Sequence, residues 1–281
     1  MDGDVPLPYF DALFAAIERG APGLSATFAH HVHWGYWGPA DRADGSFTDF
    51  AAAAERLTRR LCDAAGVRPG DRVLDAGCGL GGTLASLDQR FLGLSLTGLN
   101  IDPRQVTRAA ERVVPRAGNQ LTFHVGDACR MPFADASFDH VLAVECIFHF
   151  PSRARFFAEA RRVLRPGGRL TLCDFVPRAY VVPSLTFAKR FLRWHIEAAT
   201  GPIDIRCTLD RYRALAREAG FSVALVDDIT RGTLPTYPVL RRLAPETGAN
   251  RHVAAAWILA LETASRTGGV RYTILSFDAL G

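Results

Sequence analysis

Hydrophobic and polar residues change their spacing at about residue 70 of the chain. Beyond that point, short apolar runs rich in β-branched residues alternate with longer segments in which apolar residues recur every three or four positions. The short runs predict buried strands, and the longer segments predict amphipathic helices. Strands that alternate with helices are typical of a parallel sheet with helices on both faces. Most of the chain therefore predicts an α/β fold.

The pattern predicts strands at 72–76, 95–100, 121–125, 140–144, 169–175, 221–227 and 271–277. Helices are predicted at 82–91, 103–116, 153–164, 209–219 and 250–267. Turn-forming sequences with Pro and Gly separate these elements, and one of them, Arg165-Pro166-Gly167-Gly168, precedes the fifth strand.

Two segments depart from this alternation. Residues 1–65 have a mainly helical pattern, broken by an aromatic stretch at 30–38, and predict an N-terminal helical lid on a core of residues 66–281. Residues 176–207 follow the fifth predicted strand and contain a bulky amphipathic run. Because ligands of parallel α/β sheets bind beyond the carboxyl ends of the strands, this insertion predicts a cap over the binding site. Phe191 and Trp194 of the cap are candidate walls of a substrate pocket.

Composition narrows the class of protein. The chain is 48% hydrophobic and has a net charge of +4, from 33 basic and 29 acidic residues, which argues against a disordered chain. The basic residues are scattered, so we expect no nucleic acid as a partner. No apolar run approaches the roughly 20 residues that span a bilayer, and the first residues lack the basic start of a signal peptide. We therefore expect no membrane partner; homo-oligomerisation stays open.

The six cysteines are widely separated and include no Cys-x-x-Cys pair. This spacing argues against a zinc site and against a disulfide framework, and it suits a reducing cytoplasm. His30, His31 and His33 lie close together, but no acidic cluster accompanies them. They form no recognisable set of metal ligands. We therefore expect a cytoplasmic protein without a metal site.

A glycine-rich loop is the strongest chemical signal. The sequence Asp75-Ala76-Gly77-Cys78-Gly79-Leu80-Gly81-Gly82 directly follows the first predicted strand and opens a helix. Glycines there permit a tight turn and let a ligand approach the backbone at a helix N-terminus. The string also satisfies the Gly-x-Gly-x-x-Gly pattern of dinucleotide sites.

The residues around the loop argue against a nicotinamide dinucleotide. Such a site wants an acidic residue at the end of the second strand, and this chain has Asn100 there. The acid lies instead at Asp75, just before the loop. A carboxylate at that position suits an ammonium group, and the loop amides can hold a carboxylate. The expected ligand is a nucleoside that carries an amino acid.

The segment 73–79 resembles motif I of the class I S-adenosylmethionine-dependent methyltransferases. Further segments resemble later motifs of that family in the expected order, at 98–105, 126–128, 131–139 and 164–170. The resemblance covers about residues 60–280. It implies a Rossmann-like methyltransferase fold with a seven-stranded, mostly parallel sheet whose last strand is antiparallel.

The resemblance also implies which residues bind the cofactor. From the methionine end to the adenine end, the expected contacts with S-adenosylmethionine are Asp75, Gly77, Gly79, Asn100, Ile101, Gln105, Asp127 and Ala128. Because Asn100 replaces the usual acid, its contact with the ribose is expected to be weaker or shared with Gln105.

His149 and Asp174 are candidates for the chemistry, because they follow the fourth strand and end the fifth. A histidine supported by a carboxylate in that crevice can remove a proton from a nucleophile. The pattern of Glu145 and His149, followed by Asp174, resembles methyltransferases of natural-product pathways. Examples are the sugar O-methyltransferases of rebeccamycin and erythromycin biosynthesis and, more distantly, γ-tocopherol methyltransferase. In the rebeccamycin type the His and Asp are the proposed base pair, and Glu145 is expected to face the methyl donor or the substrate.

The sequence His33-Trp34-Gly35-Tyr36-Trp37 resembles an element that precedes the core in the same subgroup and folds over the cofactor. We expect Tyr36 to line the cofactor, since an aromatic face suits a sulfonium cation. His33 and Trp37 are expected on the substrate side.

The resemblance implies transfer of a methyl group from S-adenosylmethionine to a small secondary metabolite, with S-adenosylhomocysteine as the product. The His/Asp pair favours oxygen as the acceptor. C-methylation, for example of a prenyl diphosphate or an aromatic carbon, and N-methylation stay open. So do a cyclase that uses the cofactor as a scaffold and a binding protein without turnover. A prenyl diphosphate would favour Mg²⁺ near the cap, but the sequence offers no ligand set for it.

Overall fold

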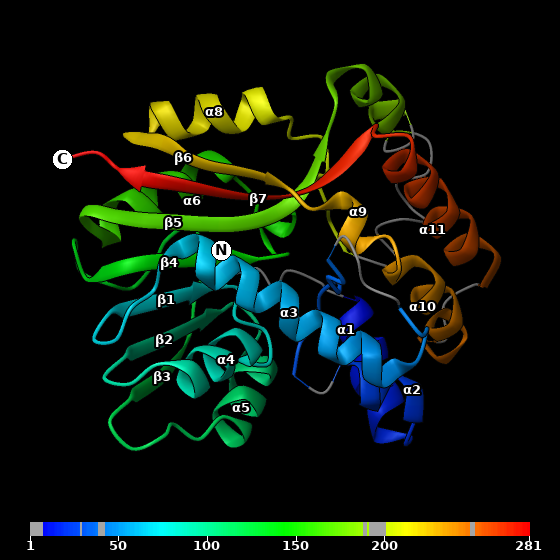
Figure 1. Ribbon diagram of the computed structural model, residues 1–281, viewed down its shortest axis with the longest axis horizontal. Helices are drawn as coiled ribbons and strands as arrows, with labels where there is room; N and C mark the ends of the chain where they lie inside the picture. The colour runs from blue at the N-terminus through cyan, green and yellow to red at the C-terminus, as the bar shows by residue number, and fades with distance from the viewer. Residues whose placement is uncertain (1–7, 29, 39–42, 188–189, 191–200, 248–250) are drawn as a thin grey trace.

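The computed structural model describes residues 8–28, 30–38, 43–187, 190, 201–247 and 251–281. Its centre is a seven-stranded sheet with the order β3-β2-β1-β4-β5-β7-β6. Strands β1 to β5 run parallel to one another, and β7 is antiparallel to its neighbours β5 and β6. In Figure 1 the carboxyl ends of the parallel strands point toward a group of helices on the right. The predicted α/β class and the antiparallel last strand are confirmed.

The strands are β1 (Arg72–Ala76), β2 (Ser95–Asn100), β3 (Gln120–Val125), β4 (Phe138–Val144), β5 (Leu164–Pro177), β6 (Phe221–Asp228) and β7 (Val270–Ala279). All seven lie where the pattern predicts them. β5 begins earlier than predicted, because Leu164 already pairs with Phe138 ahead of a shift in register. The predicted Pro-Gly-Gly turn therefore forms the irregular entry of this strand, where Gly167 has a φ of 73°.

Five helices pack against the sheet: α3 (Phe47–Ala65), α4 (Gly82–Arg90), α5 (Pro103–Arg112), α6 (Arg153–Val163) and α8 (Leu209–Glu218). Local signals in the sequence set their ends. The Ser46 hydroxyl accepts the amide hydrogen of Asp49 at the start of α3, and α3 ends at Gly66 in the left-handed conformation. Thr208 caps α8 in the same way as Ser46 caps α3.

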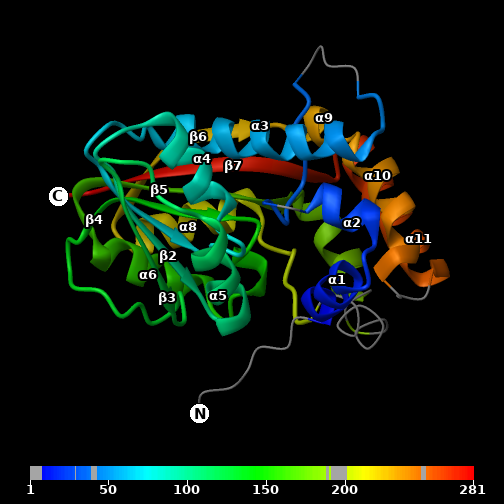
Figure 2. The same ribbon diagram turned by 90° about the horizontal axis from the view of Figure 1, so that it is seen from below.

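The helices form two layers. On one face, Leu57 and Leu61 of α3 and Leu84 of α4 are buried against the strands. On the other face, Phe157 of α6 and Tyr212 of α8 are fully buried. Figure 2 shows α3 and α4 on one side of the sheet and α6 and α8 on the other.

The predicted N-terminal lid divides into two parts. Helix α3 belongs to the core, because its apolar face packs against β4, β5 and β7. The predicted boundary at residue 65 therefore does not separate a lid from the core. Only the part before α3, with α1 (Pro8–Glu18), α2 (Pro22–Thr27) and the segment 30–38, lies beyond the sheet.

A second insertion lies between β6 and β7, and the sequence predicted only its last helix. It contains α9 (Thr230–Thr233), α10 (Thr236–Leu243), a 3-10 helix η3 (Ala244–Thr247) and α11 (Arg251–Arg266). These helices lie beside α1 and α2 in both views (Figures 1 and 2). The Leu24 amide donates to Glu246 at 3.1 Å, and the Trp37 amide donates to the Gly232 carbonyl at 2.8 Å. Residues 8–28 and 30–38 thus form one helical lobe with residues 230–247 and 251–266 at the carboxyl ends of the strands.

The predicted cap follows β5. It begins with a 3-10 helix, η2 (Ala179–Val181), and the helical residues 182–187, and residues 201–207 lead back to α8. Phe191 and Trp194, the predicted pocket walls, lie outside the described residues. None of the described helices is both long enough and apolar enough to cross a membrane.

Phe157 offers a test of the packing on the α6 face. Its ring is fully buried and contacts the rings of Tyr212, Phe221 and Phe277, at centroid distances of 6.2, 6.1 and 5.3 Å. Phe157→Ala should lower the free energy of unfolding by about 3–5 kcal/mol, because it opens a cavity that rigid neighbours cannot fill. Urea denaturation measures this loss. Val114→Ala, at a side chain that is 77% exposed, should change it by less than about 0.5 kcal/mol.

Candidate active site

The three central strands bring acidic side chains to one edge of the sheet. Asp75 lies in β1, Glu145 directly follows β4, and Asp174 lies near the end of β5. The register aligns Asp75 with Leu142 and Val144 with Cys173, so Glu145 and Asp174 stand on adjacent strands at the same level. Because parallel strands end together, three carboxyl groups gather at this edge.

A cavity opens beside these side chains. Its empty space, including solvent at the mouth, is about 920 Å³. The residues predicted from sequence that line it are Asp75, Gly77, Gly79, Asn100, Ile101, Gln105, Asp127, Ala128, His33, Glu145 and His149. Tyr36 and Trp37 are not among the lining residues.

The glycine loop needs glycine at its first position. Gly77 has a φ of 85°, and a Cβ atom there would lie 2.7 Å from Cβ and Sγ of Cys146. Any larger residue would therefore clash with Cys146, which lies just after β4, and would push the loop away from β4. The loop leads into α4, whose first residues, Gly82 and Thr83, line the cavity, and a helix N-terminus suits an anionic group.

Two lining side chains carry buried polar atoms without a hydrogen-bond partner among the described residues. They are both carboxylate oxygens of Asp75 and Nε2 of Gln105. Burial raises the pKa of Asp75 to about 7, with the nearby Thr83 hydroxyl opposing the rise. Asn100 Nδ2 donates to Gln105 Oε1 at 2.9 Å and thereby turns Nε2 of Gln105 into the donor for a ligand. The cavity thus contains two buried groups that a ligand can satisfy. The Asp75 carboxylate can bind a cation, and Nε2 of Gln105 can donate a hydrogen bond.

Glu145 joins the core to the N-terminal segment. Its Oε1 accepts the Trp34 amide hydrogen at 2.8 Å and the Tyr272 hydroxyl. Its backbone has a φ of 48°, which is strained for a residue other than glycine. Burial raises the pKa of Glu145 to about 8, although both hydrogen bonds oppose the rise. The Trp34 ring packs on Tyr272 and Phe175, so the segment 31–34 is held against the cavity as a roof.

The predicted roles of the aromatic element need correction. The Tyr36 hydroxyl accepts from Nη1 of Arg60 at 2.9 Å, outside the cavity. Trp37 is buried in the helical lobe, where its Nε1 donates to Asp49 at 2.6 Å. His33 does line the cavity, but its two ring nitrogens bond to the Trp34 carbonyl and the Thr58 hydroxyl. It therefore has no ring nitrogen left for a substrate, and Trp34 is the residue of this element that contacts Glu145.

His149 ends a one-turn 3-10 helix, η1 (Ile147–His149), directly after β4. Its Nδ1 lies 3.1 Å from the carbonyl oxygen of Pro202, on the returning arm of the cap. A carbonyl only accepts, so Nδ1 carries the hydrogen and the lone pair is on Nε2. Burial lowers the pKa of His149 to about 4, so the imidazole is neutral at pH 7.

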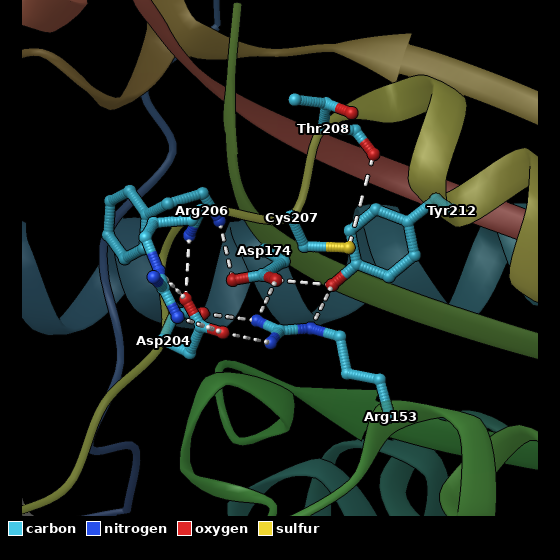
Figure 3. Close-up of polar contacts among 8 residues, drawn as sticks. Arg153, Asp174, Asp204, Arg206, Cys207, Thr208 and Tyr212 are labelled. Atoms are coloured by element: carbon cyan, nitrogen blue, oxygen red, sulfur yellow. Dashed lines mark hydrogen bonds and ion pairs between the residues drawn. The ribbon is translucent and has the colours of Figure 1, made fainter. Parts of the chain in front are cut away.

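Asp174 does not support His149 in the direct way that was predicted. Its Oδ2 accepts from Nη2 of Arg153 at 3.1 Å and from the Tyr212 hydroxyl, and its Oδ1 accepts the Phe175 amide at 2.7 Å. Figure 3 shows the Arg153 guanidinium between Asp174, Asp204 and Tyr212. Both oxygens of this fully buried carboxylate are thus engaged by groups other than the imidazole.

The close histidines of the N-terminal segment hold protein contacts. His31 Nε2 bonds to Glu55 at 2.9 Å, and the rings of His31 and His33 pack with their centroids 4.8 Å apart. Within the described part of the chain, no group of three or more His, Cys, Asp or Glu side chains is arranged to hold a metal ion.

Comparison with known proteins identifies the family. A family model described as a methyltransferase domain matches residues 74–172. A methyltransferase from Streptomyces halstedii, GfsG, is 34% identical over 227 residues, which cover 77% of this chain and 75% of the relative. The 27-O-demethylrifamycin SV methyltransferase of Amycolatopsis mediterranei is 34% identical over 215 residues, covering 76% and 75%. The chain belongs to the class I S-adenosylmethionine-dependent methyltransferases.

Solved structures share the fold of this methyltransferase. The [4+2]-cyclase SpnF has a TM-score of 0.72 at 22% identity, over 99% of this chain and 98% of that one. A geranyl diphosphate methyltransferase in complex with S-adenosylmethionine has a TM-score of 0.69 at 21% identity, over 89% and 99%. At these identities the likeness extends to the fold alone.

The cavity of the methyltransferase fits S-adenosylmethionine. The unpartnered Asp75 carboxylate suits the ammonium group, and the loop and the start of α4 suit the carboxylate of the methionine part. Nε2 of Gln105 makes no hydrogen bond of good geometry within the described residues, although the Asp102 carboxylate is near, and it can donate to a ribose hydroxyl. Both orphaned polar groups of the cavity thus match a chemical group of the cofactor.

Sequence reasoning missed Trp34, Cys146, Arg153, Tyr212 and Tyr272. Trp34 lies inside the recognised aromatic element; of the members chosen from sequence, His33 lines the cavity and Tyr36 and Trp37 do not. Arg153 stands at the start of α6 with no motif around it, and Tyr272 lies in β7, 127 residues after Glu145. No local pattern marks such long-range partners.

The orphaned carboxylate predicts how the methyltransferase binds its cofactor. Asp75→Asn should raise the Kd of S-adenosylmethionine about 10- to 150-fold, the equivalent of a charge-assisted hydrogen bond of roughly 1.5–3 kcal/mol. In the native enzyme the Kd should also rise by up to about tenfold per pH unit below about pH 7, because Asp75 must first lose a proton. The variant should lose this pH dependence. Isothermal titration calorimetry measures both effects.

The matched control is Asp139→Asn, which removes a carboxylate at the opposite end of β4, where Arg72 binds it. It should leave the Kd unchanged. An unchanged Kd in Asp75→Asn, or tight binding of NAD, would contradict this assignment of the cavity.

Proposed function

We propose that this enzyme methylates a hydroxyl oxygen of a bulky, largely apolar natural product and that His149 is its general base. The observation that carries the proposal is the place of His149 between two cavities. It lines the cofactor cavity and also a second cavity bounded by the cap. A base in that position can reach an acceptor that enters from the cap side and faces the methyl donor.

The second cavity suits an apolar acceptor. Its empty space, with solvent at the mouth, is about 1140 Å³. Its apolar lining comes from η1, the cap and α8: Phe148, Phe150, Pro151, Val182, Pro202, Ile203 and Leu215. Side chains of this kind bind a large hydrocarbon framework by excluding water from it.

The charges of the second cavity argue against a prenyl diphosphate as the acceptor. Among the residues that the structure describes, three arginines line it, and each is paired with a carboxylate. Arg153 binds Asp174, Arg206 binds Asp204 at 2.8 Å, and Arg211 lies 3.4 Å from Glu218. A diphosphate needs positive charge that the protein has not already neutralised. Because these arginines are already paired, the cavity favours a neutral acceptor. A neutral acceptor supports O-methylation over C-methylation of a prenyl diphosphate.

The chain's own residues then divide the work. S-adenosylmethionine, when bound, supplies an electrophilic methyl group on a sulfonium. Asp75 and the glycine loop hold its amino-acid end, and the roof around Trp34 excludes water from the cavity. The lone pair on Nε2 of His149 accepts the proton of the acceptor hydroxyl as the oxygen attacks. The neutral imidazole needs no prior deprotonation at pH 7, because burial lowers its pKa.

Two relatives support oxygen as the acceptor, whereas a relative from Schizosaccharomyces pombe is named as a sterol 24-C-methyltransferase. Of the two, one is named for the 27-O position of a demethylrifamycin, and the other, from Pyrenophora dematioidea, is named as an O-methyltransferase.

The six cysteines are free thiols, which supports a reducing compartment such as the cytoplasm. The number of copies in the working enzyme is left to direct measurement.

The proposal predicts the effect of removing the base. With labelled S-adenosylmethionine and a panel of hydroxylated macrocycles that includes 27-O-demethylrifamycin SV, mass spectrometry should detect an O-methylated product. His149→Ala should lower kcat for that product about 10²- to 10⁴-fold, the usual worth of general-base catalysis. The Kd of S-adenosylmethionine should change little, because the imidazole acts on the acceptor.

His124→Ala is the matched control, since it removes a histidine of β3 that lines neither cavity, and it should keep most of kcat. Near-native kcat in His149→Ala would contradict the general-base role of His149. It would instead favour an acceptor atom that has no proton to lose. A product without an added methyl group would point to cyclase chemistry instead.

The low pKa of His149 sets the pH dependence. At saturating S-adenosylmethionine, kcat/KM for the acceptor should stay level from about pH 8 down to about pH 5. It should fall only as the imidazole gains a proton near pH 4, because a protonated histidine cannot accept the proton of the hydroxyl. An acid limb near the ordinary histidine value of about 6.5 would contradict the buried, neutral imidazole.

A further inference from the structure

His149 is held by a segment that has its own anchor in the protein. The imidazole bonds to the carbonyl of Pro202. Two residues later, the Asp204 amide donates to the Phe148 carbonyl at 2.8 Å, next to the histidine. The returning arm of the cap, residues 202–206, therefore contacts η1 at two points, the imidazole of His149 and the carbonyl of Phe148. Whatever positions this arm also positions the imidazole.

Arg153 is the anchor of the arm. Its side chain is only 9% exposed, and its Nη2 donates to the Asp204 carbonyl. Its Nη1 lies 3.9 Å from the Asp204 carboxylate, and its Nε donates to the Tyr212 hydroxyl at 3.2 Å. The guanidinium thus spans from α6 to the arm and to α8 (Figure 3).

Asp174 holds the guanidinium in turn. It is fully buried near the end of β5, and it binds both Arg153 and Tyr212. A charged guanidinium is stable in this interior only with a carboxylate beside it. The strand, α6, α8 and the arm therefore meet at one buried ion pair.

We propose that Arg153 and Asp174 are positioning residues that set the tautomer and orientation of His149 through the arm at 202–206. The ion pair holds Asp204, Asp204 holds the arm, and the Pro202 carbonyl then keeps the hydrogen on Nδ1 of His149. The lone pair is thereby kept on Nε2, where a base needs it. This inference rests on the proposed role of His149 as the base, but its first readout does not require turnover.

The ion pair is tested by removing both of its charges together. Arg153→Met/Asp174→Leu replaces the buried pair by apolar side chains, an exchange that folded proteins often tolerate. In ¹⁵N-histidine-labelled enzyme, long-range ¹H–¹⁵N correlation spectra distinguish the two tautomers of His149, whose signals are assigned by their loss in His149→Ala. We expect the native enzyme to show one tautomer, with hydrogen on Nδ1. The double variant should show a mixture of tautomers.

Kinetics supply the second readout. The double variant should lose about 10- to 100-fold in kcat, the usual effect of removing a group that orients a catalytic ligand or base. The Kd of S-adenosylmethionine should stay the same, which a general loss of structure would not allow. Arg153→Lys keeps the charge but lacks the planar fork that reaches three partners, so it should restore only part of kcat.

Arg213→Met is the matched control, because Arg213 also belongs to α8 but lines neither cavity and is paired with Asp210 at the surface. It should leave the tautomer and kcat unchanged. A double variant that binds the cofactor normally and keeps both the single tautomer and the native kcat would overturn the inference. If the double variant does not fold, Asp174→Asn, which keeps the shape, gives the same two readouts. Failure of the general-base proposal is separate, because it appears in His149→Ala.

Discussion

A carboxylate cannot be buried at low cost unless a donor or a cation satisfies it. The methyltransferase meets this constraint three times along one edge of its sheet, at Asp75, Glu145 and Asp174. Glu145 and Asp174 find donors within the protein, and both donors come from distant parts of the chain. Among the described residues, Asp75 has only the nearby Thr83 hydroxyl, which is outside hydrogen-bond geometry, and the ammonium group of the cofactor is the partner that fits it.

Each satisfied carboxylate also fixes one wall of the site. Glu145 binds the Trp34 amide and so holds the N-terminal roof against the cofactor cavity. Asp174 binds Arg153 and so holds the arm of the cap beside His149. The roof and the arm carry no regular helix or strand at these points, and their backbones are held by hydrogen bonds that lead to the buried carboxyl groups of Glu145 and Asp174. One physical requirement therefore shapes both the cofactor side and the acceptor side.

The two sides differ in how closely the fold specifies them. The cofactor side is built from strand ends and a glycine loop, which belong to the sheet itself. The acceptor side is built from the cap and the turn after β4, which the sheet only supports. Proteins with the same fold include a cyclase and a geranyl diphosphate methyltransferase, so the fold leaves the reaction open. The proposal for the acceptor accordingly depends on the apolar lining and the matched arginines of the second cavity.

Local sequence determined the strands, most of the core helices and the residues of the cofactor cavity. Strand and helix periods act over a few residues, and the glycine loop and strand-end polar residues lie next to the elements they follow. The tertiary structure alone decided that the Trp34 amide binds Glu145 while Tyr36 lies outside the cavity, that the insertion between β6 and β7 joins the N-terminal lobe, and that Asp174 binds Arg153. The partners of a buried carboxyl group lie up to 127 residues away in the chain. Their choice depends on which side chains the packed layers bring together, and no local pattern carries that information.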